Sequence, residues 1–456
     1  MQDDLFGQPT SLSTAAGIEA WNAAQRGFLA HAAATPERLA QVLLAEPDFA
    51  LGHAARGLFC LLLGRREMVA AARDSLEAAR AAQRRAGATG REAAYLEALA
   101  DGLAGRPSGA VRRLEAVLRA NPGDALAMKL SQAIRFVLGD AAGMRRSAER
   151  LLPAYDAAHP ARGYLMGCHA FALEETGAYQ RAEIAGRQAL WLAPDDAWGL
   201  HAVAHVHEMT GDAGRGIDWL EGHEAAWAHC NNFRYHVWWH LALMHLDRGR
   251  IDRVLDLYDR QIRADRTDDY RDIANAASLL MRLDLEGVPT GARWRELADL
   301  AAARTEDGCL IFADLHYLLA LGGDGRRPAA ARLLRRIRRD ARAGATETQQ
   351  AMARPGLDAA RGLAAFSGGR FAAAFRHLAR ARDSLHLAGG SHAQRDVFER
   401  MAIDAGIRAG LLDQAEGVLD ARQARRAGRE DGYSAARRDL IAAGRGQPAL
   451  RRIPAQ

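Results

Sequence analysis

The chain has 456 residues, of which 49% are hydrophobic and only 6% are aromatic, with many alanines and leucines and few β-branched residues. This composition favours helices and excludes a mainly β fold. The 61 basic residues barely exceed the 56 acidic ones, which argues against a nucleic-acid partner, and the four cysteines are too scattered for a disulfide framework.

The first twenty residues, MQDDLFGQPTSLSTAAGIEA, are polar and acidic, so they resemble no signal peptide. We expect residues 1–20 to form a loosely held extension. Elsewhere, no apolar run approaches the roughly 20 residues of a membrane-spanning helix. These features predict a cytoplasmic protein without a membrane partner.

Residues 21–160 carry loose helical repeat patterns, such as LLAEPDFALGHAARG near residue 50 and GRPSGAVRRLEAVLRANPGDALA from Gly105. From residue 161 to residue 425 the patterns become more regular. The segment GAYQRAEIAGRQALWLAPDDAW, which begins at Gly177, has a turn glycine, small residues at helix contacts and a terminating proline. This arrangement resembles the second half of a tetratricopeptide repeat.

The turn glycines Gly177, Gly211 and Gly249 are spaced by 34 and 38 residues. This period predicts an all-α fold, a tetratricopeptide-like right-handed α-solenoid of about seven to nine helix pairs. The solenoid is either open or tightly curled around a central pocket. Residues 426–456 are expected to form a C-terminal helix and tail, and arginines between Arg332 and Arg342 are expected on a solvated helix face.

Half of the sixteen histidines lie between residues 201 and 245. At about 100° per residue, His201, His205 and Glu208 share one helix face, and His236 and His240 share a face of the next first helix. First helices of stacked repeats line the concave surface, so these side chains are expected to converge. The same geometry turns the neighbouring His207 and His245 away.

Four imidazoles and a carboxylate resemble the metal centres that helical proteins build, with ligands suited to zinc, iron, nickel or manganese. Glu208 is then either a ligand or a general base. The alternative is that each histidine is buried and hydrogen-bonds the neighbouring repeat. The HxxxH spacing is not the HExxH motif, so no protease mechanism is implied.

Five motifs in order, VAHVHEM, HVWWHLAL, SLLMRLDLEGV, FADLHYLLAL and GGSHAQRDVF, are similar to the tetratricopeptide repeat protein 38 family. The resemblance runs from about residue 160 to about residue 425 and implies a helical repeat protein without an established activity. It also implies that the polar motif positions belong to a site. The matching residues are His201, His205, Glu208, His236, Trp239, His240, Asp314, His316, Gln394, Arg395 and Asp396.

From this pattern we predict metal ligands at His201, His205, His236, His240 and His316, catalytic groups at Glu208 and Asp314, and substrate contacts from Trp239, Gln394, Arg395 and Asp396. Asp314 and His316 point apart on a helix, so only one faces the groove, and Asp314 is equally an orienting acceptor for an imidazole. Arg395 either binds a carboxylate or phosphate, or braces Asp396. Trp239 either stacks on a ligand or packs in the core.

Two functions remain open. One is a metal-dependent enzyme, hydrolytic or oxygen-dependent, or a binder of a small-molecule ligand. The other is a non-catalytic scaffold that binds a peptide segment of a partner protein in its groove. Lys129 is the only lysine, so the clamp of lysines and arginines with which some repeats hold a peptide carboxylate is absent.

Overall fold

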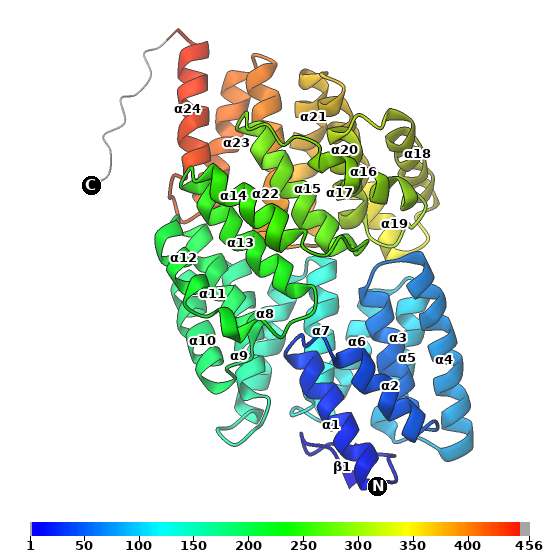
Figure 1. Ribbon diagram of the computed structural model, residues 1–456. Coiled ribbons are helices and arrows are strands. Elements are labelled where there is room, and N and C mark those ends of the chain that lie inside the picture. The colour runs from blue at the N-terminus through cyan, green and yellow to red at the C-terminus, as the bar shows by residue number, and fades with distance from the viewer. Residues whose placement is uncertain (1, 447–456) are drawn as a thin grey trace.

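The computed structural model describes residues 2–446 of a chain that is almost entirely helical (Figure 1). The all-α prediction is confirmed. The two short strands within this range, β1 (Gln2–Asp3) and β2 (Pro9–Thr10), form one antiparallel ribbon. The predicted tail after residue 446 lies outside the described residues. No helix among residues 2–446 has the length and apolarity to cross a membrane.

The N-terminal part of the array consists of four helix pairs, shown in blue to cyan in Figure 1. The pairs are α1 (Ala15–Leu29) with α2 (Thr35–Ala45), α3 (Ala50–Leu62) with α4 (Arg66–Ala86), α5 (Gly90–Leu103) with α6 (Pro107–Ala120), and α7 (Ala125–Leu138) with α8 (Ala141–Leu151). A short 3-10 helix, η1 (Leu152–Ala154), leads out of this part.

The central part contains the regular repeats. Its pairs are α9 (Arg162–Glu175) with α10 (Tyr179–Leu192), α11 (Ala197–Met209) with α12 (Ala213–Glu221), α13 (Phe233–Asp247) with α14 (Ile251–Leu257), and α15 (Tyr270–Leu285) with α16 (Arg293–Ala303). A 3-10 helix, η2 (Glu224–Ala226), and a π-helix, η3 (Tyr258–Ile262), lie between them. The predicted turn glycines Gly177, Gly211 and Gly249 have φ of 80°, 70° and 68°, which allows the tight turn within each pair.

The C-terminal part continues the stack toward α24, drawn in red (Figure 1). Its elements are α17 (Ile311–Gly323) with α18 (Arg327–Ala343), α19 (Glu347–Ala351), η4 (Met352–Gly356), α20 (Leu357–Ser367) with α21 (Phe371–Arg382), η5 (Leu385–Ala388), α22 (His392–Arg408) with α23 (Leu412–Arg425), and α24 (Gly432–Gly444). Eleven pairs are therefore present in residues 2–446, more than the seven to nine predicted, because several pairs lack the repeat's sequence pattern.

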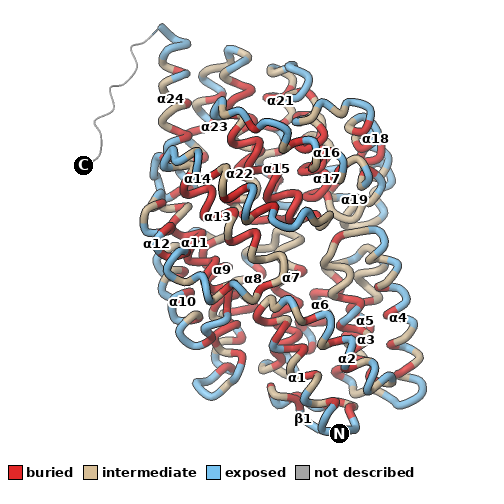
Figure 2. Tube along the Cα trace, viewed as in Figure 1, coloured by how far each residue is buried: buried red, intermediate tan, exposed pale blue. Residues whose placement is uncertain are grey.

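The array closes on itself. Helix α22 packs against both α11 and α15, and η5 packs against α7. At the other side, Glu347 N donates to Gly105 O at 3.0 Å. Buried residues accordingly line the interior faces of the helices from one end of the stack to the other (Figure 2). The concave side is thus enclosed rather than open as a long groove, which agrees with the tightly curled alternative.

Two glycines allow the close approach of η5 to α7. Gly139, which ends α7, has φ of 70°, and a Cβ atom there would lie 1.9 Å from the backbone oxygen of His386 in η5. Gly389, which follows η5, has φ of 85°, and a Cβ atom there would lie 2.6 Å from the backbone oxygen of Val137 at the end of α7. Any side chain at position 389 would therefore push η5 away from α7.

The N-terminal residues are more firmly packed than predicted. Phe6 and Leu12 are 5% and 2% exposed. The backbone N–H of Ser11 donates to Glu92 Oε1 on α5 at 2.9 Å. The expectation of a loosely held extension is wrong for these residues, because Phe6 and Leu12 pack into the hydrophobic core that α1 and α5 share.

Candidate metal centre

Helices α11 and α13 place four buried imidazoles around one point. His201 and His205 lie one turn apart on α11, and His236 and His240 lie one turn apart on α13. Asp196 fixes the start of α11, because its Oδ2 accepts from the backbone N–H of Gly199 at 3.1 Å. A nitrogen atom of each of the four imidazoles lies within 4.8 Å of the others, so the predicted convergence is confirmed.

The Nε2 atoms are the ones that meet. His201 Nε2 lies 2.9 Å from that of His205, 3.0 Å from that of His236 and 3.1 Å from that of His240, and the last two are 3.2 Å apart. Nitrogen ligands at metal bonds of about 2.0–2.1 Å are separated by roughly 3.0–3.4 Å in octahedral or tetrahedral sites. His201 has three neighbours at this separation, which a square-planar arrangement does not allow.

The Nδ1 atoms of His240 and His236 are oriented by acceptors, whereas His205 Nδ1 lies 3.5 Å from Glu174 Oε2 without a hydrogen bond. His240 Nδ1 lies 2.9 Å from Glu208 Oε2, and His236 Nδ1 lies 2.9 Å from Asn275 Oδ1. Such acceptors fix the tautomer and the ring orientation of metal-binding histidines. Glu208 therefore faces the outer side of an imidazole, rather than the point where the Nε2 atoms converge.

The environment keeps the four imidazoles neutral. Burial lowers the pKa of every one of them below its ordinary value. For His201, His236 and His240, the neighbouring imidazoles lower the pKa further. Neutral imidazole is the form that binds metals.

Glu174 and Asn275 were not predicted as site residues, although the repeat period pointed to Glu174. It precedes Glu208 by 34 residues, which is the interval between Gly177 and Gly211. Neither carboxylate oxygen of Glu174 has a hydrogen-bond partner among residues 2–446. Burial, followed by the neighbouring Glu175, raises the pKa of Glu174 well above its ordinary value.

The described part of the chain contains two groups of candidate metal-binding residues, the four histidines and a second group of Glu174, Glu175 and His205. His316 and Asp314 on α17 belong to neither group. His316 Nδ1 lies 2.8 Å from the backbone oxygen of Phe312. Burial lowers the pKa of His316 to about 4. Asp314 is buried against the guanidinium of Arg336, a member of the predicted solvated arginine run that is only 2% exposed. The structure thus places both residues in the core rather than beside the four imidazoles.

The predicted substrate contacts separate into two places. Trp239 is fully buried and stacks on His236, with ring centroids 5.1 Å apart. Gln394 closes a capping box with Ser391 and lines a central cavity of about 300 Å³ together with His201 and His236. This cavity lies on the enclosed side of the array and adjoins the imidazoles.

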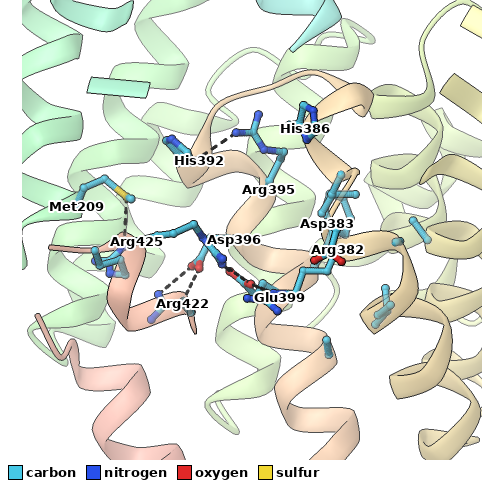
Figure 3. A pocket seen from close by; sticks show the side chains of 17 residues that line it. Met209, Arg382, Asp383, His386, His392, Arg395, Asp396, Glu399, Arg422 and Arg425 are labelled. Carbon is cyan, nitrogen blue, oxygen red and sulfur yellow. Dashed lines mark hydrogen bonds and ion pairs between the residues drawn. The ribbon is translucent and has the colours of Figure 1, made fainter. Parts of the chain in front are cut away.

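Arg395 and Asp396 line a different cavity, of about 370 Å³, near α21 and α23 (Figure 3). Arg395 Nη2 lies 3.2 Å from Glu175 Oε2 at the end of α9. Asp396 accepts from Arg422 at 2.5 Å and from Arg400 at 2.7 Å. Burial raises the pKa of Asp396, but Arg422 and Arg400 lower it by more than burial raises it. The net result is a pKa below the ordinary value, so the carboxylate stays ionised. Both predicted residues brace the helices that close the array.

No family model matches the chain. Among solved structures, the complex of Naa15 and Naa10 bound to HypK-THB is similar over 89% of this chain and 68% of that chain, with 13% sequence identity and a TM-score of 0.25. A likeness this distant carries no argument about fold or function, so both are argued from the chain's own residues.

Proposed function

We propose that the protein binds one transition-metal ion through His201, His205, His236 and His240, and acts on or binds a small molecule in the adjoining cavity. The proposal combines two features of the described residues. Four neutral imidazoles offer nitrogen atoms at the mutual separations of metal ligands. A cavity of about 300 Å³ has two of these imidazoles in its wall.

The contact between His236 and His240 carries the proposal. The Nδ1–H of His240 donates to the carboxylate of Glu208, and the Nδ1–H of His236 donates to the amide oxygen of Asn275. Both neutral rings therefore present unprotonated Nε2 atoms to each other, at 3.2 Å. Two lone pairs at this distance repel each other, and a cation between them would remove the repulsion, whereas burial disfavours a shared proton because it lowers both pKa values.

A bound ion would polarise a carbonyl or lower the pKa of a water molecule. The residues around it act by orientation: Glu208 and Asn275 hold the imidazoles, and Trp239 packs against His236. Four imidazoles complete a tetrahedral zinc site, whereas iron, nickel or manganese with five or six ligands keeps a position for substrate. We therefore favour one of these three metals for an enzymatic role.

The enclosed concave side supports a small-molecule ligand over an extended peptide. Helix α22 packs against α11 and α15 across the side on which a peptide groove would run. The cavity that remains has the volume typical of a small-molecule site.

Elemental analysis of protein purified without chelators tests the proposal. We expect close to one transition-metal ion per chain, abolished in His205→Ala and in His240→Ala. His207→Ala on α11 and His245→Ala on α13 are matched controls, because both side chains are buried on the same helices but lie outside the four-histidine group. Metal-free wild-type protein, or variants of His205 and His240 that retain the ion, would refute it.

A further inference from the structure

The central cavity has an apolar aromatic wall with a single unpaired cation. Seven aromatic side chains from separate parts of the chain line it: Phe28, Phe59, Phe136, Trp198, Phe233, Tyr270 and Phe312. Lys129 on α7, the only lysine in the sequence, also lines it and is 4% exposed. A cation in this position is costly unless an anion accompanies it.

Lys129 forms no ion pair with a carboxylate of residues 2–446. Its Nζ lies 4.0 Å from Cys168 Sγ and 5.2 Å from the ring centroid of Trp198. Burial raises the pKa of the Cys168 thiol to about 11, so this sulfur carries no charge near neutral pH. Burial raises the pKa of the nearby Asp196 to about 7, although Lys129 lowers it, so this carboxylate is only partly ionised near neutral pH.

Arg271, the other cationic residue of the cavity wall, is already paired with a carboxylate. Arg271 makes a bidentate pair with Asp269, with Nε–Oδ1 and Nη2–Oδ2 distances of 2.9 Å and 2.7 Å. Its charge is therefore compensated within the protein. Lys129 is left as the group of the cavity that can neutralise a ligand's charge.

Other polar atoms of the wall also lack partners. Gln132 and Asn275 line the cavity and are 3% and 2% exposed, yet Gln132 Oε1 and Asn275 Nδ2 have no hydrogen-bond partner among the described residues. Buried polar groups in folded proteins are nearly always hydrogen-bonded. Their position in the cavity wall indicates that a ligand with polar groups supplies the bonds.

The cation and the imidazoles share one neighbour. The indole of Trp198 lies 5.2 Å from Lys129 Nζ, and its ring centroid lies 5.2 Å from that of His201. A ligand whose anionic group contacts Lys129 therefore has its remaining atoms among the aromatic side chains and toward the four histidines.

We propose that the central cavity binds a small carboxylic acid with an aromatic body, held by Lys129 at its carboxylate and directed toward His201 and His236. This inference rests on the proposed function and names its ligand class. An ammonium group attracts a carboxylate strongly in a site of low polarity, and the aromatic wall removes the ligand's rings from water.

Titration calorimetry with benzoate, phenylacetate and 3-phenylpropionate, each compared with its neutral amide, tests the assignment. We expect at least one acid to bind wild-type protein at least tenfold more tightly than its amide. Lys129→Met, which keeps the length and removes the charge, should abolish this preference, and Lys129→Arg should retain most of it. Absence of binding by all three acids, or an unchanged preference in Lys129→Met, would overturn the proposal.

Two further measurements separate this proposal from the metal centre. The metal content of Lys129→Met should equal that of the wild type, since Lys129 is not in the four-histidine group. The acid preference should also be present in metal-free protein, because the contact with Lys129 does not need the ion. Wild-type protein that is purified without metal but shows the acid preference would contradict only the metal centre, and wild-type protein that holds the metal but lacks the preference would contradict only the ligand assignment. If Lys129→Met fails to fold, an acid preference in Lys129→Arg weaker than tenfold would overturn the assignment.

Discussion

Glu208 on α11 accepts a hydrogen bond from His240 on α13, with Oε2 and Nδ1 2.9 Å apart. The bond crosses from one repeat to the next, so it joins the stacking of the two helices to the orientation of an imidazole. It also fixes the proton of His240 on Nδ1, which leaves Nε2 free for a metal ion.

Substitution of Glu208 should weaken metal binding without abolishing it. Glu208→Ala removes the acceptor of His240, and we expect the dissociation constant for the metal to rise about 10- to 100-fold, as is typical for lost partners of metal-binding histidines. Glu208→Gln keeps an acceptor and should show a smaller rise. Competition with a chromophoric chelator measures both. If Glu208→Ala bound metal as tightly as the wild type, the orienting role would be refuted.

Removal of the metal should lower the stability of the protein. An ion at 100 times its dissociation constant stabilises the folded state by about 2.7 kcal/mol. Thermal unfolding of wild-type protein with and without a strong chelator measures this, and we expect a lower midpoint after chelation. His205→Ala is the control, whose midpoint the chelator should leave unchanged. An equal shift in this variant would show that the chelator acts elsewhere.

We expect Asp314 to stabilise the fold rather than to take part in the metal centre. It is buried against Arg336, and each side chain is 1% exposed. Arg336→Met leaves a buried carboxylate without its partner, which typically costs about 3–5 kcal/mol. The double variant Asp314→Asn with Arg336→Met should be less destabilised than Arg336→Met alone, as judged by urea unfolding. Metal content should stay unchanged in Asp314→Asn, and its loss would return Asp314 to the site.

Asp272 should contribute stability that is lost as the pH rises from about 4 to 7. Burial, followed by the neighbouring Asp269, raises the pKa of Asp272 from 3.8 to about 7. The folded state therefore retains a proton that the unfolded state has lost, and this contribution is complete below pH 3.8 and is lost as the pH approaches 7.

Asp272→Asn removes this titrating group, so the slope of the urea-unfolding free energy against pH should become more positive. We expect the slope to change by up to about 1.4 kcal/mol per pH unit within this window. Parallel slopes for wild type and variant between pH 4.5 and 6.5 would contradict the raised pKa.

The sequence predicted the helical class and the convergence of the four histidines, because both follow from local periodicity. The spacing of His201 with His205 and of His236 with His240 sets helix faces, and the repeat period sets which helices adjoin. Glu174 was missed although it lies one period before Glu208. The unique Lys129 was noticed, but its place in the cavity was not predicted.

The features that the sequence did not predict depend on contacts between distant segments. Arg336 lies within a run that looks solvated, yet the packing of α18 against α17 buries it beside Asp314. Gln394 and Arg395 are adjacent in sequence but line different cavities, since α22 separates the two. Helical spacing predicts in which direction a side chain points from its own helix. The burial of Arg336 and the separation of Gln394 from Arg395 depend instead on how the array closes.

X-ray absorption spectroscopy at the edge of the metal found by elemental analysis tests the central claim most directly. The account predicts a first shell containing four nitrogen ligands at about 2.0–2.2 Å, with the outer-shell scattering of imidazole rings, and a reduced imidazole contribution in His240→Ala. A first shell of oxygen or sulfur ligands without imidazole scattering would contradict it.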